Sequence, residues 1–172
     1  MPLSDEAKAW AFAAGIPCLA VLGSIPALPY TFSKDAWHWY KSLKRPSWAI
    51  PADKLIPASL AIDTLVVPPL LYGTKEVYLK GGLTDRDSRA ALISYMALFA
   101  SGALIKPIIM KMKGLKSANY GMLFFLADSL LMTHLYYRVD RTAGYCTLPF
   151  TVFMGYYMFQ LYRMWCLNEG EE

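Results

Sequence analysis

Three side chains that can carry a proton, Asp63, Asp128 and His134, interrupt the long apolar stretches of this chain. An ionisable group is costly inside an apolar helix, so a proton-carrying or substrate-binding role is the first hypothesis for each. Asp128 and His134 are six residues apart and would not share a helix face. No nucleophile–base pair accompanies them, and a structural hydrogen bond explains them equally well. An enzyme that uses one of the three as acid or base stays one interpretation. Asp63 and Asp128 are candidate polar residues of a pocket.

The three cysteines, Cys18, Cys146 and Cys166, are scattered and odd in number. No Cys-x-x-Cys motif or Cys/His cluster appears, so the sequence indicates neither a disulfide framework nor a metal site. The pattern indicates no cofactor. We expect the cysteines to pack as small apolar side chains.

The elements that must position these groups are five uncharged or nearly uncharged runs of membrane-spanning length. A helix that crosses a hydrocarbon core of ~30 Å needs about 20 mostly apolar residues. Hydrophobic residues make up 56% of the 172 residues and charged residues 17%, whereas soluble domains contain roughly 25% charged residues. The runs are Trp10–Tyr30, Leu55–Tyr72, Ala90–Ile105, Ser117–Tyr137 and Thr142–Tyr162.

The predicted fold is an all-α, integral, multi-pass membrane protein: a five-transmembrane-helix bundle forming one domain over residues 1–172. A soluble bundle would need a polar face on each helix, but Ala11–Tyr30 contains no charged residue. A membrane β-barrel would need short alternating segments, which are not seen. Short connections force sequential helices to be antiparallel. We expect the helices near 9–30, 52–74, 89–110, 117–138 and 146–167.

The formal net charge of +4 comes from basic residues in the loops. With five spans, the side that carries the C-terminus has ten Lys and Arg residues and the other side seven. The positive-inside rule then places the C-terminus in the cytosol, by a thin margin. We interpret basic loops such as 111–113 as contacts with anionic membrane lipids, not with nucleic acid.

Two aromatic groups could form a binding site. Residues 37–48 contain three tryptophans and the stiffening Pro46, which fits either an interfacial anchor or a folded lid over one end of the bundle. The last helix carries Phe150, Phe153 and Tyr157 at helical spacing, with Tyr156 and Gln160 on an adjoining stripe. Such a stripe could line a cavity for a planar apolar ligand, or it could pack against helices and lipid.

The loop motif carries a resemblance to a known family. Trp39-Tyr40, then Ser42-Leu43-Lys44-Arg45-Pro46-Ser47-Trp48, then Pro51 and Pro57, resemble the first loop and second helix of the TSPO/MBR family, the tryptophan-rich translocator proteins. The resemblance extends over roughly residues 12–168. It includes Tyr95 and Pro107 in the third helix and Pro149-Phe150, Tyr162, Trp165 and Asn168 in the fifth.

The resemblance implies a cavity between the helices that binds sterols or porphyrins beneath the first loop. Membrane lipids and a hydrophobic small molecule are then the expected partners. In a eukaryote it implies the mitochondrial outer membrane. A sterol-type pattern is met by Val152, Tyr157 and Arg163, although such patterns are common by chance. The candidate ligand-binding residues are Trp39, Trp48, Pro51, Tyr95, Pro107, Phe153, Tyr156, Tyr157, Tyr162 and Arg163.

Several positions depart from the family pattern, and some of them line the family's cavity. Ile50, Asp53 and Ser59 replace residues of the extended loop motif; Gly102, Ala103, Ile105 and Lys106 replace the usual Asn, Trp and Pro residues of helix 3; and Phe153 and Leu161 replace a Trp and an Asn. The family's helix 3 dimer glycines are also replaced, by Ile93 and Ala97, which leaves homodimerisation open.

Three functions therefore remain. The first is a translocator-like protein that binds, and in one version transports, a sterol or porphyrin. The second is a non-transporting structural or regulatory protein that has lost the ligand. The third is a membrane enzyme acting on a sterol or porphyrin.

Overall fold

The computed structural model describes residues 3–27, 29 and 33–169, except for the side chains of residues 55, 56, 59, 60, 106, 107, 109 and 110. The described part is all-helical, with six α-helices, two short 3₁₀ turns and no strand. The all-α class predicted from the sequence is confirmed.

Five of the helices are long and one is short. The first long helix is preceded by Ser4, whose hydroxyl accepts a hydrogen bond from the Ala7 amide at 3.2 Å, as an N-cap does. The short helix α3 lies between the first two long helices in sequence. The bounds are α1 Asp5–Ser24, α3 Lys34–Ser42, α4 Leu55–Gly81, α5 Arg86–Met112, α6 Leu115–Val139 and α7 Arg141–Asn168.

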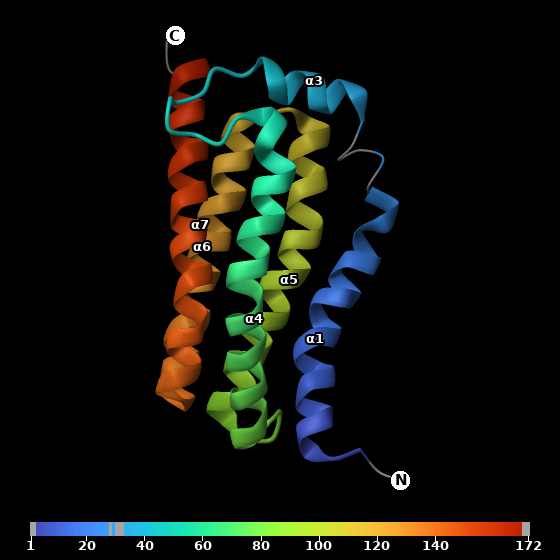
Figure 1. Ribbon diagram of the computed structural model, residues 1–172, viewed down its shortest axis with the longest axis vertical. Helices are drawn as coiled ribbons and strands as arrows, with labels where there is room; N and C mark the ends of the chain where they lie inside the picture. Colours follow the sequence, from blue (N-terminus) through green and yellow to red (C-terminus); the bar gives the residue numbers. More distant parts are fainter. Residues whose placement is uncertain (1–2, 28, 30–32, 170–172) are drawn as a thin grey trace.

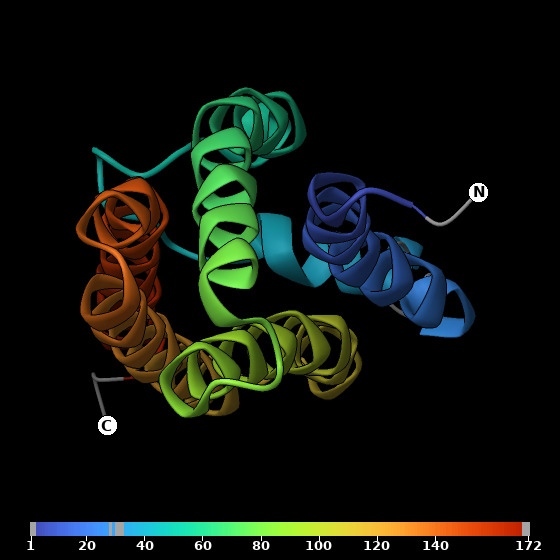
Figure 2. The same cartoon turned by 90° about the horizontal axis from the view of Figure 1, so that it is seen from below.

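The long helices form a ring in the order α1, α4, α7, α6, α5, which is visible along the bundle axis in Figure 2. From α4 onwards, sequential neighbours run antiparallel because their connections are short. Helix α4 also touches α5 and α6, so it fills part of the interior of the ring. Helix α3 lies across the end at which α4 begins and α7 finishes (Figure 1).

The turns are fixed by local chemistry. Gly82 follows α4 with φ of 55°, a conformation that favours glycine. Asp140 ends α6 and also caps α7, because its Oδ1 accepts from the Ala143 amide at 2.9 Å. A side chain at Gly144 would place a Cβ 2.7 Å from the Cα of Tyr137. Glycine is therefore required for α6 and α7 to meet this closely.

Two helix boundaries differ from those expected. The sequence predicts that the last helix begins near residue 146, with Pro149 in its first turn, but α7 begins at Arg141 because Asp140 caps it there. The second long helix continues to Gly81. Its added turns include Lys75, whose Nζ pairs with Glu76 at 2.7 Å and lies 4.8 Å from the Tyr72 ring centroid. These contacts allow the charged Lys75 side chain to be buried.

The main core joins α4, α5, α6 and α7 at the end of the bundle opposite α3. Its most buried members are apolar or aromatic, and hydroxyl groups link the helices between them. Thr74 and Tyr136 join α4 to α6 with 2.8 Å between their oxygens. Thr133 and Thr151 join α6 to α7 at 2.8 Å. The fully or almost fully buried core residues include Leu70, Val77, Ala91, Leu92, Tyr95, Leu98, Met132, Tyr136 and Ala143.

The outside of the bundle is apolar. Large hydrophobic side chains on α1, α4, α6 and α7 are more than half exposed, as expected for surfaces that face lipid. Among the described residues, Asp5–Ala27 and Arg86–Ile105 are long and apolar enough to be membrane spans by the usual hydropathy criterion. Helices α4, α6 and α7 contain 27, 25 and 28 residues, so each has the length that a span needs. The count of five spans stays a prediction.

Candidate ligand-binding site

Helix α3 is an amphipathic cap over one end of the bundle. Its N-terminus is fixed by Ser33, whose hydroxyl accepts a hydrogen bond from the Ala36 amide at 3.1 Å. Asp35 lies in the first turn and Lys41 in the last, each favourable for the helix dipole. Ala36 and Tyr40, four residues apart, form its buried face. The segment is folded and lies across one end of the bundle, as the lid interpretation expects (Figure 1).

The segment after α3 is attached to the end of α7. The Lys44 amide donates to Asn168 Oδ1 at 2.9 Å, and Asn168 Nδ2 donates back to the Lys44 carbonyl at 2.9 Å. The same Nδ2 also donates to the Met164 carbonyl at 2.7 Å. The Asn168 carboxamide therefore pairs with the Lys44 backbone in the way that a neighbouring β-strand would. This pairing holds residues 43–51 against the bundle.

Arg45 joins the end of α3 to the same loop. Its guanidinium donates to the Tyr40 carbonyl at 2.5 Å and to the Ile50 carbonyl at 3.4 Å. It also lies over the Tyr40 ring, 4.3 Å from the centroid, in a cation–π arrangement. One side chain thus fixes both sides of the bend that follows α3.

Trp48 places the loop on the aromatic stripe of α7. Its ring stacks on Phe159 at 5.3 Å between centroids and meets Tyr156 edge-on at 5.8 Å. Phe153 continues the stripe, with centroids 6.4 Å from Tyr156 and 6.1 Å from Tyr157. The result is a continuous set of rings that runs from the lid loop to the middle of α7.

Beneath α3, a second apolar cluster closes the end of the bundle. Tyr40 packs there with Leu161 and Met164 of α7, and Trp37, Trp39 and Tyr157 lie against them. Burial raises the pKa of the Tyr40 hydroxyl above its ordinary value, and the Arg45 guanidinium opposes the shift. Tyr40 is therefore neutral at physiological pH, as a buried phenol should be.

Gln160 is a buried polar side chain in this part of α7. It is fully buried, and among the described residues neither its Oε1 nor its Nε2 has a hydrogen-bond partner. Leaving a buried amide unpaired costs about 1–3 kcal/mol for each group. Gln160 lies one helical turn from Tyr157 and Met164. The buried aromatic end of the bundle therefore also contains an amide that can both donate and accept a hydrogen bond.

The geometry agrees with a comparison of the chain with known protein families. A model described as the TspO/MBR family matches residues 13–166. The chain belongs to the TspO/MBR family. Members of this family are embedded in membranes and bind hydrophobic ligands, and membership indicates a translocator-like role in ligand binding. A comparison with curated proteins found no match.

The predicted site residues of this TspO/MBR protein fall into separate places. Trp48, Phe153, Tyr156 and Tyr157 come together at the loop and α7. Trp39 packs against the cluster under α3. Pro51 and Arg163 are exposed, and Tyr162 lies on the side of α7 that faces α6. Their roles in ligand binding stay predictions.

The two predicted site residues of α5 are Tyr95 and Pro107. Tyr95 is fully buried, its hydroxyl donates to the Ala13 carbonyl at 2.6 Å, and its ring meets Phe99 edge-on. This hydrogen bond joins α5 to α1 in the main core. Pro107 lies in α5, but its side chain is outside the described part of the structure.

The three proton-carrying candidates lie on two different helices. Asp63 of α4 and His134 of α6 are exposed. Asp128 of α6 accepts a hydrogen bond from the Ser94 hydroxyl of α5 at 3.0 Å, and its Oδ2 has no partner among the described residues. The contact with Ser94 is the kind of structural hydrogen bond expected as the alternative to catalysis.

Sequence reasoning missed the groups that hold the lid. Arg45 and Asn168 were visible only as members of the family motif, and Tyr40 only as a neighbour of Trp39. The signal available for Arg45 was its place directly before Pro46, where a rigid bend benefits from a side chain that binds two carbonyls. For Asn168 there was no local signal, because its partner is 124 residues away in the chain.

Proposed function

We propose that this TspO/MBR protein binds a sterol or a tetrapyrrole between its helices, beneath α3 and the 43–51 loop. The ligand would be captured in the bundle, enclosed by the loop and released when the loop opens, which is one step of transport across or along the membrane. In a eukaryotic cell the proposed location is the mitochondrial outer membrane. A planar apolar ligand is best bound by aromatic walls with few polar groups, and the α7 stripe has this composition.

The observation that carries the proposal is the contact of Trp48 with Tyr156 and Phe159. It puts Trp48 of the lid against Tyr156, whose ring adjoins Phe153 and, through it, Tyr157, the more buried rings that would contact the ligand. Trp48 and Phe159 themselves are about half exposed. A movement of the loop would therefore change the packing of the aromatic rings on α7. A ligand stacked on these rings would in turn change the position of the loop. Asn168 supplies a polar latch that can break and reform, since the hydrogen bonds it makes to Lys44 are exposed.

Gln160 supports a ligand that is not purely hydrocarbon. Its buried carboxamide would gain hydrogen bonds from a hydroxyl, carboxyl or pyrrole group. Together with Phe153 and Leu161, which stand where the family has Trp and Asn, it favours a ligand preference that differs from that of other members. The hydroxyl of a sterol and the carboxylates of a porphyrin both meet the requirement.

The test is a fluorescence titration of the purified protein in nanodiscs with protoporphyrin and with a fluorescent cholesterol analogue. We expect saturable quenching of tryptophan emission, weakened in Trp48→Ala and in Phe153→Ala. Trp10→Phe is the matched control, because Trp10 lies at the other end of the bundle, beside Lys75. It should lower the starting emission and leave the dissociation constant unchanged.

Gln160→Leu tests the polar part of the proposal. It removes an unpaired amide, so it should raise the melting temperature and weaken binding of the polar ligand. The absence of a saturable response to both ligands in the wild-type protein would overturn the proposal. It would favour the alternative of a protein that has kept the fold and lost the ligand.

A further inference from the structure

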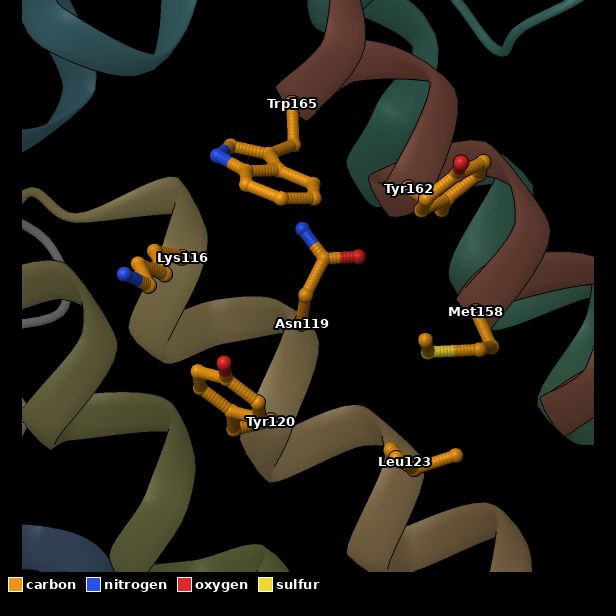
Figure 3. A pocket seen from close by; sticks show the side chains of 7 residues that line it. All are labelled: Lys116, Asn119, Tyr120, Leu123, Met158, Tyr162 and Trp165. Carbon is orange, nitrogen blue, oxygen red and sulfur yellow. The ribbon is translucent and has the colours of Figure 1, made fainter. Parts of the chain in front are cut away.

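A narrow groove lies on the outside of the bundle between α6 and α7, away from the aromatic stripe. Its cavity volume is about 160 Å³. Tyr120 and Leu123 of α6 and Tyr162 of α7 are about half exposed or more, so the groove opens sideways to the surroundings of the bundle. Figure 3 shows the lining residues, which are Lys116, Asn119, Tyr120, Leu123, Met158, Tyr162 and Trp165.

The lining changes in character along the helices. Lys116 is in the first turn of α6, and Trp165 is in the last turn of α7, so both lie near one end of the bundle. Leu123 and Met158 lie about two turns further from that end. The charged end also adjoins Lys113 in the turn between α5 and α6. The groove therefore has a basic and aromatic end, which we call its head, and an apolar part lined by Leu123 and Met158, which we call its floor. This order matches the charged headgroup and hydrocarbon chain of a membrane lipid.

Asn119 is the polar residue between head and floor, and it is 8% exposed. Its Nδ2 donates to the Leu115 carbonyl at 2.9 Å and to the Leu161 carbonyl at 3.3 Å. These two bonds fix the orientation of the carboxamide. Its Oδ1 is buried and has no hydrogen-bond partner among the described residues.

In Figure 3 the Asn119 oxygen is directed towards the α7 side of the groove, where Tyr162 and Met158 lie. Tyr162 is 45% exposed and its ring packs against Trp165 with 6.2 Å between centroids, so a ligand reaches the buried oxygen only when this ring turns outwards. An acceptor held in this way needs a donor, and a buried acceptor without one costs about 1–3 kcal/mol. A hydroxyl or N–H that enters from the groove would supply this donor.

The size of the groove limits the occupant. A cavity of about 160 Å³ is close to the ~150 Å³ that accommodates a benzene molecule. Pockets for drug-sized ligands span about 300–1,000 Å³. The groove is therefore too narrow for the ring system of a sterol or a tetrapyrrole. It has the size for part of one hydrocarbon chain.

We propose that the α6–α7 groove binds a single-chain phospholipid that carries a free hydroxyl beside its phosphate, the chemistry of a lysophospholipid. The phosphate pairs with Lys116, the hydroxyl donates to Asn119 Oδ1, and the chain lies on Leu123 and Met158. A two-chain phosphatidic acid has no free hydroxyl on its glycerol, a two-chain lipid with a polyol headgroup brings a second chain for which the groove has no room, and a sterol has no charge for Lys116. The groove is a second site, separate from the site proposed beneath α3.

The first test changes the lipid and leaves the protein intact. Native mass spectrometry of the wild-type protein in detergent would measure binding of oleoyl lysophosphatidic acid, its 2-O-methyl ether and dioleoyl phosphatidic acid. The ether keeps the charge and the chain but cannot donate to Asn119. We expect the lysophospholipid to bind best and the ether about fivefold more weakly, as the loss of one hydrogen bond implies. Equal binding of all three lipids would overturn the proposal.

The second test locates the site. Leu123→Trp and Met158→Trp fill the floor of the groove and should abolish saturable binding. Leu131→Trp is the matched control, because Leu131 is also a half-exposed leucine of α6 but lies outside the groove. Lys116→Gln should weaken binding about fivefold, and Lys113→Gln should weaken it less. Binding that survives both groove-filling variants would place the lipid elsewhere and overturn the proposal.

Discussion

The hydroxyl of Tyr95 replaces a backbone hydrogen bond that Pro17 removes. Pro17 lies inside α1 and has no amide hydrogen, so the carbonyl four residues earlier, that of Ala13, has no partner within the helix. The Tyr95 hydroxyl of α5 donates to this carbonyl at 2.6 Å. A membrane helix tolerates an interior proline when a neighbour satisfies the freed carbonyl. Tyr95 therefore allows α1 to be interrupted and also attaches it to α5.

Replacing Tyr95 with Phe should destabilise the protein by about 1–3 kcal/mol, because a buried carbonyl loses its donor. The ring contact with Phe99 remains in this variant. The effect should shrink to less than about 1 kcal/mol when Pro17 is also replaced with Ala, since residue 17 then supplies an amide. Thermal unfolding of the two single variants and the double variant measures this coupling. Equal destabilisation by Tyr95→Phe with and without Pro17 would show that the two residues act independently.

The same pair shows what the sequence could and could not predict. Five long apolar runs leave few alternatives to an all-α bundle, so the class followed from composition and run length. The sequence marks Tyr95 as part of the family resemblance, but its hydrogen bond to the carbonyl that Pro17 leaves without a partner in α1 depends on the register of α1 against α5. The same holds for Asn168 and Lys44, which meet only when the bundle has closed. The pattern of neighbouring residues predicts each helix. Contacts between helices that are far apart in the sequence depend on how the helices pack, which a short stretch of sequence does not show.

Asn168→Ala should release the 43–51 loop from α7. The variant removes the reciprocal pair of hydrogen bonds with the Lys44 backbone. Each is worth about 1 kcal/mol, so the loss of both should accelerate amide hydrogen exchange of residues 43–51 by roughly thirtyfold. If the loop is the lid, the ligand should also dissociate faster. Exchange mass spectrometry and stopped-flow fluorescence measure the two effects.

Lys44→Ala is the control for the latch. The two hydrogen bonds of Asn168 are to the backbone amide and carbonyl of Lys44, so this change keeps both. Loop exchange should stay near the wild-type rate. A similar acceleration in Lys44→Ala and Asn168→Ala would mean that the carboxamide does not hold the loop.

Arg45→Lys should weaken the bend after α3 although the charge is kept. A lysine has no planar fork to reach the carbonyls of Tyr40 and Ile50 together. We expect a loss of about 1 kcal/mol in stability and greater solvent exposure of Trp37 and Trp39, seen as a red shift of tryptophan emission. Arg45→Ala should give a larger shift because it also removes the contact with the Tyr40 ring. An unchanged spectrum in both variants would show that α3 is held without Arg45.

Stability should decrease in acid because of Asp140, which both caps α7 and pairs with Lys80 at 2.6 Å. The hydrogen bond from Lys80, followed by that from the Ala143 amide, lowers the pKa of Asp140 below its ordinary value. A carboxyl with a lowered pKa in the folded state adds stability above its unfolded pKa of about 3.9, and this stability is lost as the pH falls through the folded value.

Two substitutions separate the cap from the charge. Asp140→Asn keeps an oxygen for the Ala143 amide and loses the charge, so its melting temperature should depend less on pH between neutral and acid conditions. Asp140→Ala loses both functions and should cost about 1 kcal/mol more than Asp140→Asn at neutral pH. Because half of the Lys80 side chain is exposed, the ion pair alone should contribute less than about 1 kcal/mol. A pH profile of Asp140→Asn identical to that of the wild-type protein would assign the acid sensitivity to another carboxylate.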